Sequence, residues 1–357
     1  MRTRTSLVLA ALGAVVLTLG IVYGSGPVGE TEQTLQGQLV FPDLTPKLAD
    51  AAQVEIRHGT LTVHLARDPK QAHAPWSVAE RGGYPAQQDK VHSLLVALTE
   101  LRLDAARTAD PAEYARLGVG NPGKGHDATL VRVLDAKGGV IAALILGHTR
   151  SAQRGSADTL YIRRPEAAQR WLADGKVLAS GEALDWLDRK IVDIDAKRIA
   201  GVTATRGAAT VAFARKNGAF TVVDPAEHPA LDDYKVDQVS GALAGLELED
   251  VQKAPAPGTP LGHTVFTTTD GLTVAVDVTK AGPAVWATFA VTGGKDAAPL
   301  EAKLKGWAYE IGSWKESALA PTLASVQAAA PAASAVPPGH PAHLHDPMTA
   351  LPGSGGQ

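Results

Sequence analysis

The apolar positions of this chain follow a helical period in two stretches that resemble each other. In each stretch a Lys-Val pair opens a series in which apolar residues recur at i, i+3, i+7 and i+10. The matching positions are Val91, Leu94, Leu98 and Leu101 in the first stretch, and Val236, Val239, Leu243 and Leu246 in the second. This spacing places each series on one face of an α-helix. Each stretch, 76–103 and 220–249, therefore predicts a short strand, a turn and an amphipathic helix.

Alternating apolar and polar positions predict β-hairpins between these helices. The hairpins are expected at 54–65 about His58-Gly59, at 130–146, at 202–213 and at 265–278. The last is centred on Asp270-Gly271, which suits a type I′ turn because both central residues then take positive φ. The segment 167–200 is expected to close the first half with helix and a short strand. Hairpin, aromatic strand, helix and hairpin thus occur twice, which predicts an α+β fold of two divergent repeats, each an antiparallel sheet of hairpins with a packed helix.

The two ends of the chain depart from this pattern. An uncharged apolar run from Leu7 to Tyr23 follows Arg2 and Arg4, which predicts a transmembrane helix with the rest of the chain outside the cytoplasm. A cleaved signal peptide ending at Gly24 is the alternative, and it exports the chain as well. We expect the following division: 1–6 cytoplasmic stub, 7–24 transmembrane anchor, 25–38 linker, 39–200 first repeat, 201–324 second repeat, and 325–357 disordered tail rich in Ala, Pro and His.

Composition narrows the classes of function. The 357 residues carry a net charge of −3 and include no cysteine. Thiolate metal sites, disulfides and cysteine nucleophiles are therefore excluded. The charge balance provides no basic field, so we expect no nucleic-acid partner.

A glycine-rich loop at 118–125, GVGNPGKG, contains the spacings of two phosphate-binding motifs. Such a loop binds phosphate only when a strand precedes it and a helix opens after it. Here the helical pattern PAEYARL precedes the loop, Pro122 removes one amide, and Gly125 stands where Ser or Thr would hold magnesium. We therefore expect an ordinary loop and no nucleotide.

Other candidate groups also favour structural roles. His340, His343 and His345 with Asp346 are competent metal ligands, but they lie in the Pro-rich tail. Paired carboxylates can hydrolyse glycosides, but Arg and Lys residues are interleaved with the four acids of the densest cluster: Asp185, Asp188, Asp193 and Asp195. No GxSxG, SxxK or HExxH motif is present. We thus predict no catalytic, cofactor-binding or metal-binding residue, and no enzyme.

Six tryptophans could stack against a sugar or a peptide: Trp76, Trp171, Trp186, Trp286, Trp307 and Trp314. Trp76 and Trp186 occupy apolar positions that have counterparts in the second half. For these two, packing in the core is the stronger expectation.

Several motifs together resemble a bacterial family, number 4340 in the domain-of-unknown-function series. They are VFPDL at 40–44, WSVAERGGYPAQQDKVHSLLVAL at 76–98, ADPAEYARLGV at 109–119 and WLDRKIVDID at 186–195. The similarity covers about 39–319 and is strongest at 76–195. The resemblance implies a single-pass inner-membrane protein encoded beside ABC transporter permeases and gliding-motility-type auxiliary proteins. It implies no catalytic or binding residues.

These observations lead to three hypotheses of function. The first is a membrane-tethered periplasmic accessory or scaffold module that binds protein partners in an ABC-type transport or cell-envelope complex. The second is a binder of an envelope polysaccharide or peptide in a cleft between the repeats. The third is a hydrolase that uses the carboxylates of the Asp185–Asp195 cluster.

Overall fold

The computed structural model describes residues 35–71, 74–107, 109–123, 127–151 and 158–329. The apolar run at 7–23 and the three histidines of the tail lie outside these ranges. Within the described ranges, no helix is both long enough and apolar enough to cross a membrane. Two antiparallel sheets and a few helices give the α+β class that the sequence predicts.

The first sheet has nine strands in the order β4-β3-β2-β1-β6-β7-β8-β9-β5. The predicted hairpins at 54–65 and 130–146 are present as β1–β2 and β6–β7. Helix α4 (Gln88–Glu100) buries Val91, Leu94 and Leu98, so three positions of the first apolar series are confirmed; Leu101 is buried just after the helix ends. The strands are β1 (Ala51–His58), β2 (Leu61–Ala66), β3 (Ser77–Val78), β4 (Tyr84–Pro85), β5 (Arg102–Ala106), β6 (Thr129–Asp135), β7 (Val140–Arg150), β8 (Thr159–Arg163) and β9 (Arg170–Asp174).

The second sheet also has nine strands, in the order β10-β14-β18-β17-β16-β15-β11-β12-β13. Its predicted hairpins are present as β11–β12 and β15–β16. The strands are β10 (Lys190–Val192), β11 (Ile199–Arg206), β12 (Ala209–Lys216), β13 (Ala219–Asp224), β14 (Leu246–Lys253), β15 (Thr259–Thr268), β16 (Thr273–Ala281), β17 (Ala284–Thr292) and β18 (Trp307–Ile311). The longer helices of this half are α6 (Asp233–Ser240) and α7 (Ala297–Leu304).

Eight strands of each sheet follow the same order, and β4 and β10 each add one strand at an edge. The first runs β3-β2-β1-β6-β7-β8-β9-β5, and the second runs β13-β12-β11-β15-β16-β17-β18-β14. In each half three strands form one side of the sheet and a helix follows. The next strand then lies at the far edge, and four more strands fill the space between.

The far edge of each sheet is covered in a similar way. Beside β5 lies the segment 37–40, in which Gly37 N donates to Leu103 O at 2.6 Å and Val40 N donates to Leu101 O at 2.8 Å. Beside β14 lies β10. Although β10 lies in the range expected for the first half, it hydrogen-bonds in the second sheet.

One arginine in each half makes the same set of contacts. Arg67, after β2, donates from Nε to Ala51 O and from Nη2 to Leu48 O, across 16 and 19 residues of chain. Arg215, near the end of β12, donates from the same atoms to Ile199 O and Ala196 O, also across 16 and 19 residues. The guanidinium carbons lie 5.0 Å from the ring of Trp76 and 5.6 Å from the ring of Phe220, respectively.

Three local predictions are wrong in detail. The turn at Asp270-Gly271 is not type I′, because Gly271 has positive φ and Asp270 does not. Thr268 O instead accepts from Gly271 N at 3.2 Å, as in a type I turn that ends in a left-handed glycine. Helix α6 ends at Ser240, because Gly241 closes it, so Leu243 and Leu246 are buried beyond the helix. The segment 167–200 forms β9, a 3₁₀ turn (Ala183–Trp186) and β10 rather than a longer helix.

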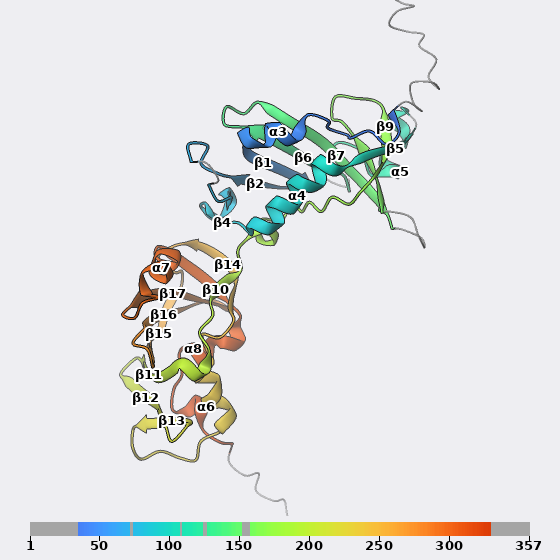
Figure 1. The fold of residues 1–357 in the computed structure, drawn as a ribbon. Helices are drawn as coiled ribbons and strands as arrows, with labels where there is room; N and C mark the ends of the chain where they lie inside the picture. Colours follow the sequence, from blue (N-terminus) through green and yellow to red (C-terminus); the bar gives the residue numbers. More distant parts are fainter. Residues whose placement is uncertain (1–34, 72–73, 108, 124–126, 152–157, 330–357) are drawn as a thin grey trace, which may run out of the picture.

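Figure 1 shows the two sheets one after the other along the length of the molecule, and they meet near β4, β10 and β14. The buried apolar side chains form a cluster that continues from one half into the other. The meeting place of the halves is therefore part of the core.

Candidate functional site

The halves are joined through the turn that precedes β4. Gly82 and Gly83 have φ values of 64° and 78°, a conformation that glycine adopts readily because it has no Cβ. This turn places Tyr84 against the second sheet, where only 1% of it stays exposed. The Tyr84 ring lies edge-on to two rings of β18, 5.0 Å from Trp307 and 6.1 Å from Tyr309. Tyr84 is thus an aromatic plug between the halves.

Charged side chains surround this plug. Arg81 donates from Nε and Nη2 to the two carboxylate oxygens of Asp250, at 2.5 and 3.1 Å. Lys253 lies with Nζ 3.4 Å from the centre of the Trp307 ring, and its stem lies against Gly82. A bidentate arginine–carboxylate pair fixes geometry as well as distance, so the contact holds the turn in one orientation.

The hydroxyl groups at this joint are not available for acid–base chemistry near neutral pH. Burial raises the pKa of both Tyr84 and Tyr309 well above the usual value for tyrosine. Tyr84 Oη donates to the backbone oxygen of Asp188 at 3.2 Å. Both phenols stay protonated, and the joint is a structural contact.

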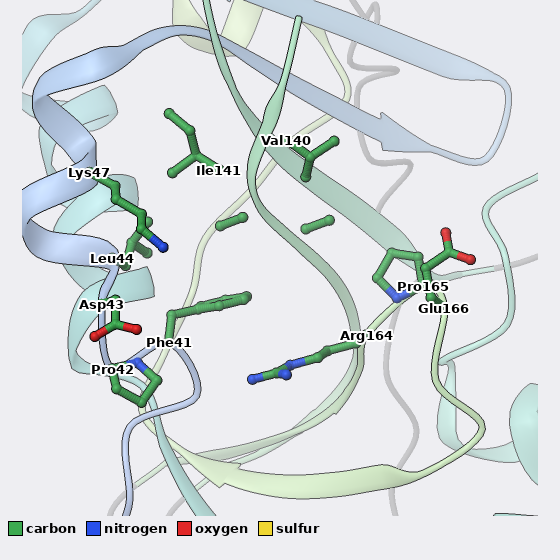
Figure 2. A pocket seen from close by; sticks show the side chains of 12 residues that line it. Phe41, Pro42, Asp43, Leu44, Lys47, Val140, Ile141, Arg164, Pro165 and Glu166 are labelled. Atoms are coloured by element: carbon green, nitrogen blue, oxygen red, sulfur yellow. The ribbon is translucent and has the colours of Figure 1, made fainter.

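Space for a ligand is found on the first half, beside the VFPDL segment. A pocket there has a volume of about 360 Å³. Figure 2 shows that Phe41 extends into it from one wall and Arg164 from the other. Val140 and Ile141 of β7 supply an apolar wall, and Val140 is 54% exposed. Arg164 is held in place because its Nη2 donates to Val40 O at 2.7 Å. We refer to this pocket as the Phe41 pocket.

A second pocket, of about 330 Å³, includes the same segment in its lining and shares Pro42 and Arg164 with the first. Its walls are mainly apolar and include Leu103 of β5, Ile162 of β8 and Trp171 of β9. We refer to it as the Trp171 pocket. The VFPDL segment thus lines two neighbouring pockets of the first half.

The chemistry of these pockets suits binding rather than catalysis. Among the described residues that line them there is no Ser, Thr, His or Tyr, and the acids are Asp43 and Glu166 of the Phe41 pocket. Apolar walls with a few polar groups are typical of a pocket that binds a ligand with apolar groups. In the sequence, VFPDL stands out only as one of the motifs that carry the family resemblance. The exposure of Val140 is visible only in the structure, so the sequence carried no signal of a surface pocket.

The glycine-rich loop lies between a helix and a strand. Helix α5 (Tyr114–Leu117) precedes it, Gly118 ends that helix with φ 68°, and β6 follows. A Cβ at Gly118 would lie 2.7 Å from the ring of His148. Gly118 therefore allows this loop to lie close to β7. Lys124 and Gly125 lie outside the described residues.

Each acid of the 185–195 cluster has its own structural partner. Asp185 accepts from Ser180 Oγ at 2.5 Å, and Asp188 lies 3.4 Å from Lys303 Nζ. Asp193 accepts from Gly245 N at 2.9 Å, and its bond with Lys190 lowers its pKa. Asp195 accepts from Lys197 N at 2.7 Å. Among these contacts, the pair of Asp193 with Lys190 joins two of the charges that are interleaved in the sequence.

The tryptophans divide between core and surface. Trp76 and Trp186 are buried, as expected, with 7% and 0% exposed. Trp314 is 72% exposed and lies beside a pocket formed with Arg189, Glu247 and Glu249.

One comparison with known proteins gives a match. A family model described as domain of unknown function (DUF4340) matches residues 76–262, a range that spans the joint between the halves. No curated protein and no solved structure matches the chain.

Proposed function

This chain belongs to the family described as domain of unknown function (DUF4340), and from that premise we propose that it is a membrane-tethered periplasmic module that binds protein partners. In this proposal it serves as an accessory or scaffold of an ABC-type transport or cell-envelope complex. The observation that carries the proposal is the pair of apolar pockets beside VFPDL, which lack catalytic groups among their described lining residues. Exposed apolar surface of this kind is typical of sites where another protein docks.

The location of the pockets supports a partner close to the membrane. Leu35, the first described residue, lines the Trp171 pocket. The apolar run expected to anchor the chain ends at Tyr23, a short distance upstream in sequence. A pocket at this position would face the periplasmic surface of a transporter subunit.

We infer further that the two halves are copies of one unit. Besides the shared strand order and the matched arginines, the halves share one more contact. In each half, the residue just before the helix hydrogen-bonds to the last segment of that half. Gln87 N donates to Trp186 O at 2.7 Å, and Asp232 N donates to Val326 O at 2.9 Å. Bridges follow at Ala86–Leu187 and at Leu231–Gln327. Because these contacts end near residue 188 in the first half and near residue 328 in the second, we refer to 35–188 as the first unit and to 189–328 as the second unit.

Trp314 favours a second candidate function, the binding of an envelope polysaccharide. An exposed tryptophan beside polar and charged groups is a platform for a sugar ring. Binding of saccharides that is lost in Trp314→Ala and retained in pocket variants of the first unit would support this alternative.

Purification of the full chain from its native membrane tests the leading proposal. We expect transporter subunits to copurify with the unaltered protein and to be lost in Val140→Lys, which places a charge in the Phe41 pocket. Tyr234→Lys is the matched control, because Tyr234 is 72% exposed on α6 of the second unit. Equal recovery of the same subunits with both variants would contradict a partner site at the Phe41 pocket.

A further inference from the structure

At the joint, a turn of the first unit inserts into a socket of the second unit. The plug is the turn 81–84, which ends in Tyr84. The socket is formed by β14 and β18, where Val251 pairs with Tyr309 and Lys253 pairs with Trp307. The ring contacts of Tyr84 are made with these two β18 residues.

The registers of the two sheets locate the same socket on the first unit. A bulge in β14 lies between Leu248 and Asp250, and three residues after Leu248 comes Val251, the partner of Tyr309. A bulge in β5 lies between Leu103 and Ala105, and three residues after Leu103 comes Ala106, the partner of Trp171. Trp171 therefore takes the position of Tyr309, and Gln169, two residues earlier, takes that of Trp307.

This equivalent socket is the Trp171 pocket. Leu103, Gln169 and Trp171 all line it, together with Ile162, which pairs with Trp171 as Ala287 pairs with Tyr309. The edge segments agree as well, since Leu103 N donates to Gln38 O and Leu248 N donates to Arg189 O, both at 2.9 Å. One position of the repeated unit is thus filled by Tyr84 in the second unit and is a pocket in the first.

From this equivalence we propose that the Trp171 pocket receives an aromatic side chain presented on a tight turn of a partner protein. The inference deepens the proposed function, on which it rests, by naming the chemistry of the partner. Trp171 offers an incoming ring the edge-to-face contact that Tyr309 offers Tyr84. Buried aromatic anchors of this kind commonly dominate the affinity of a protein interface.

Differences between the sockets define the partner more closely. Ala105 takes the position that Asp250 has in the second unit. An arginine in the partner's turn, placed as Arg81 is placed before Tyr84, would therefore find no carboxylate to pair with. Gly37 O takes the position of Asp188 O and already accepts from Arg102 Nη1 at 2.9 Å. A hydroxyl is therefore not required, and phenylalanine serves as well as tyrosine.

A second copy of this chain is a poor occupant. The turn of the second unit that corresponds to 82–85 is 227–230, because Pro85 O accepts from Asp188 N as Ala230 O accepts from Ala328 N. Its sequence, Glu-His-Pro-Ala, contains no aromatic residue. The turn of the second unit that the repeat would place in a socket thus has no aromatic side chain to insert.

A cyclic peptide that carries the sequence of residues 80–86, ERGGYPA, tests the proposal on the full chain. We expect saturable binding by calorimetry, at least about ten-fold weaker when Ser replaces the tyrosine and unchanged when Phe replaces it, since about 1.4 kcal/mol corresponds to ten-fold. A benzoylphenylalanine at the aromatic position should crosslink to residues of the Trp171 pocket. A peptide with Glu-His-Pro-Ala at its centre is the control and should not bind.

Two variants give the test its sharpest form. Trp171→Ala should abolish binding, and Ala105→Asp should strengthen it several-fold for the arginine-containing peptide only, because it recreates the partner of Arg81. Because Ala105→Asp is expected to increase the affinity, damage to the pocket cannot explain that result. Binding that is insensitive to the aromatic residue, no binding, or a crosslink from Trp171 to residues before Leu35 of the same chain would each overturn the proposal. If transporter subunits still copurify in that case, the proposed function stands and this inference alone fails.

Discussion

Tyr84 shows how a single side chain can hold together two sheets that are far apart in sequence. Two left-handed glycines, a bidentate ion pair and two aromatic rings of β18 converge on it. The sequence reveals the turn, because Gly-Gly before Tyr-Pro is a strong turn signal. It does not reveal the plug, because the rings that receive Tyr84 lie more than two hundred residues later.

Tyr84→Ala is expected to destabilise the protein by about 3–5 kcal/mol, the cost of truncating a buried aromatic side chain. Tyr84→Phe keeps the ring contacts and loses one hydrogen bond to Asp188 O, so it should cost about 0.5–1.5 kcal/mol. Unfolding in urea measures both. Equal losses for the two variants would show that the hydroxyl, and not the ring, holds the joint.

Glu310 of β18 gives the joint a pH dependence. Burial raises its pKa, and Asp250 and Glu249 raise it further. The carboxylate is therefore less stable in the folded than in the unfolded protein. This penalty develops as pH rises from the unfolded pKa to the folded pKa, is complete above the folded pKa and is absent below the unfolded pKa. Glu310→Gln should stabilise the protein at pH 7, with the gain disappearing toward pH 3. Thermal unfolding across that range is the measurement, and a gain that persists at pH 3 would assign the effect to packing.

At the scale of elements, alternation and turn signals predict the hairpins because each depends on neighbouring residues. The order of strands in each sheet depends on contacts distant in sequence, so it could not be read from the pattern. The strand β10 is an example, since Ile191 and Val192 are apolar enough for either sheet, and only packing assigns them to β14. The two pockets escape the sequence for the same reason, because β5, β7, β8 and the 39–42 segment come together only in the fold.

The two apolar series make the same contribution to both halves. Leu94→Ala and Leu243→Ala should each cost about 2–5 kcal/mol, because these side chains are 2% and 0% exposed. Leu178→Ala, at a residue that is 65% exposed, is the control and should change stability by less than about 0.5 kcal/mol. An unfolding midpoint that does not move in Leu94→Ala or Leu243→Ala would contradict a shared core role.

At the scale of the molecule, the proposed topology keeps the anchor in the membrane and both units outside. A reporter that is active only outside the cytoplasm, fused after Gln357, should be active. N-terminal sequencing that begins at Ser25 would instead identify the apolar run as a cleaved signal. Activity of a reporter that works only in the cytoplasm, at the same fusion point, would contradict export.

In the proposed function, the first unit binds a protein partner through the pockets beside VFPDL. Photo-crosslinking in the native membrane tests it most directly, with a photoreactive residue at Val140 and, separately, at Tyr234. We expect adducts with an ABC-type transporter subunit from Val140 and none from Tyr234. Adducts with that subunit from Tyr234 alone, or from neither position while the subunit still copurifies, would contradict it.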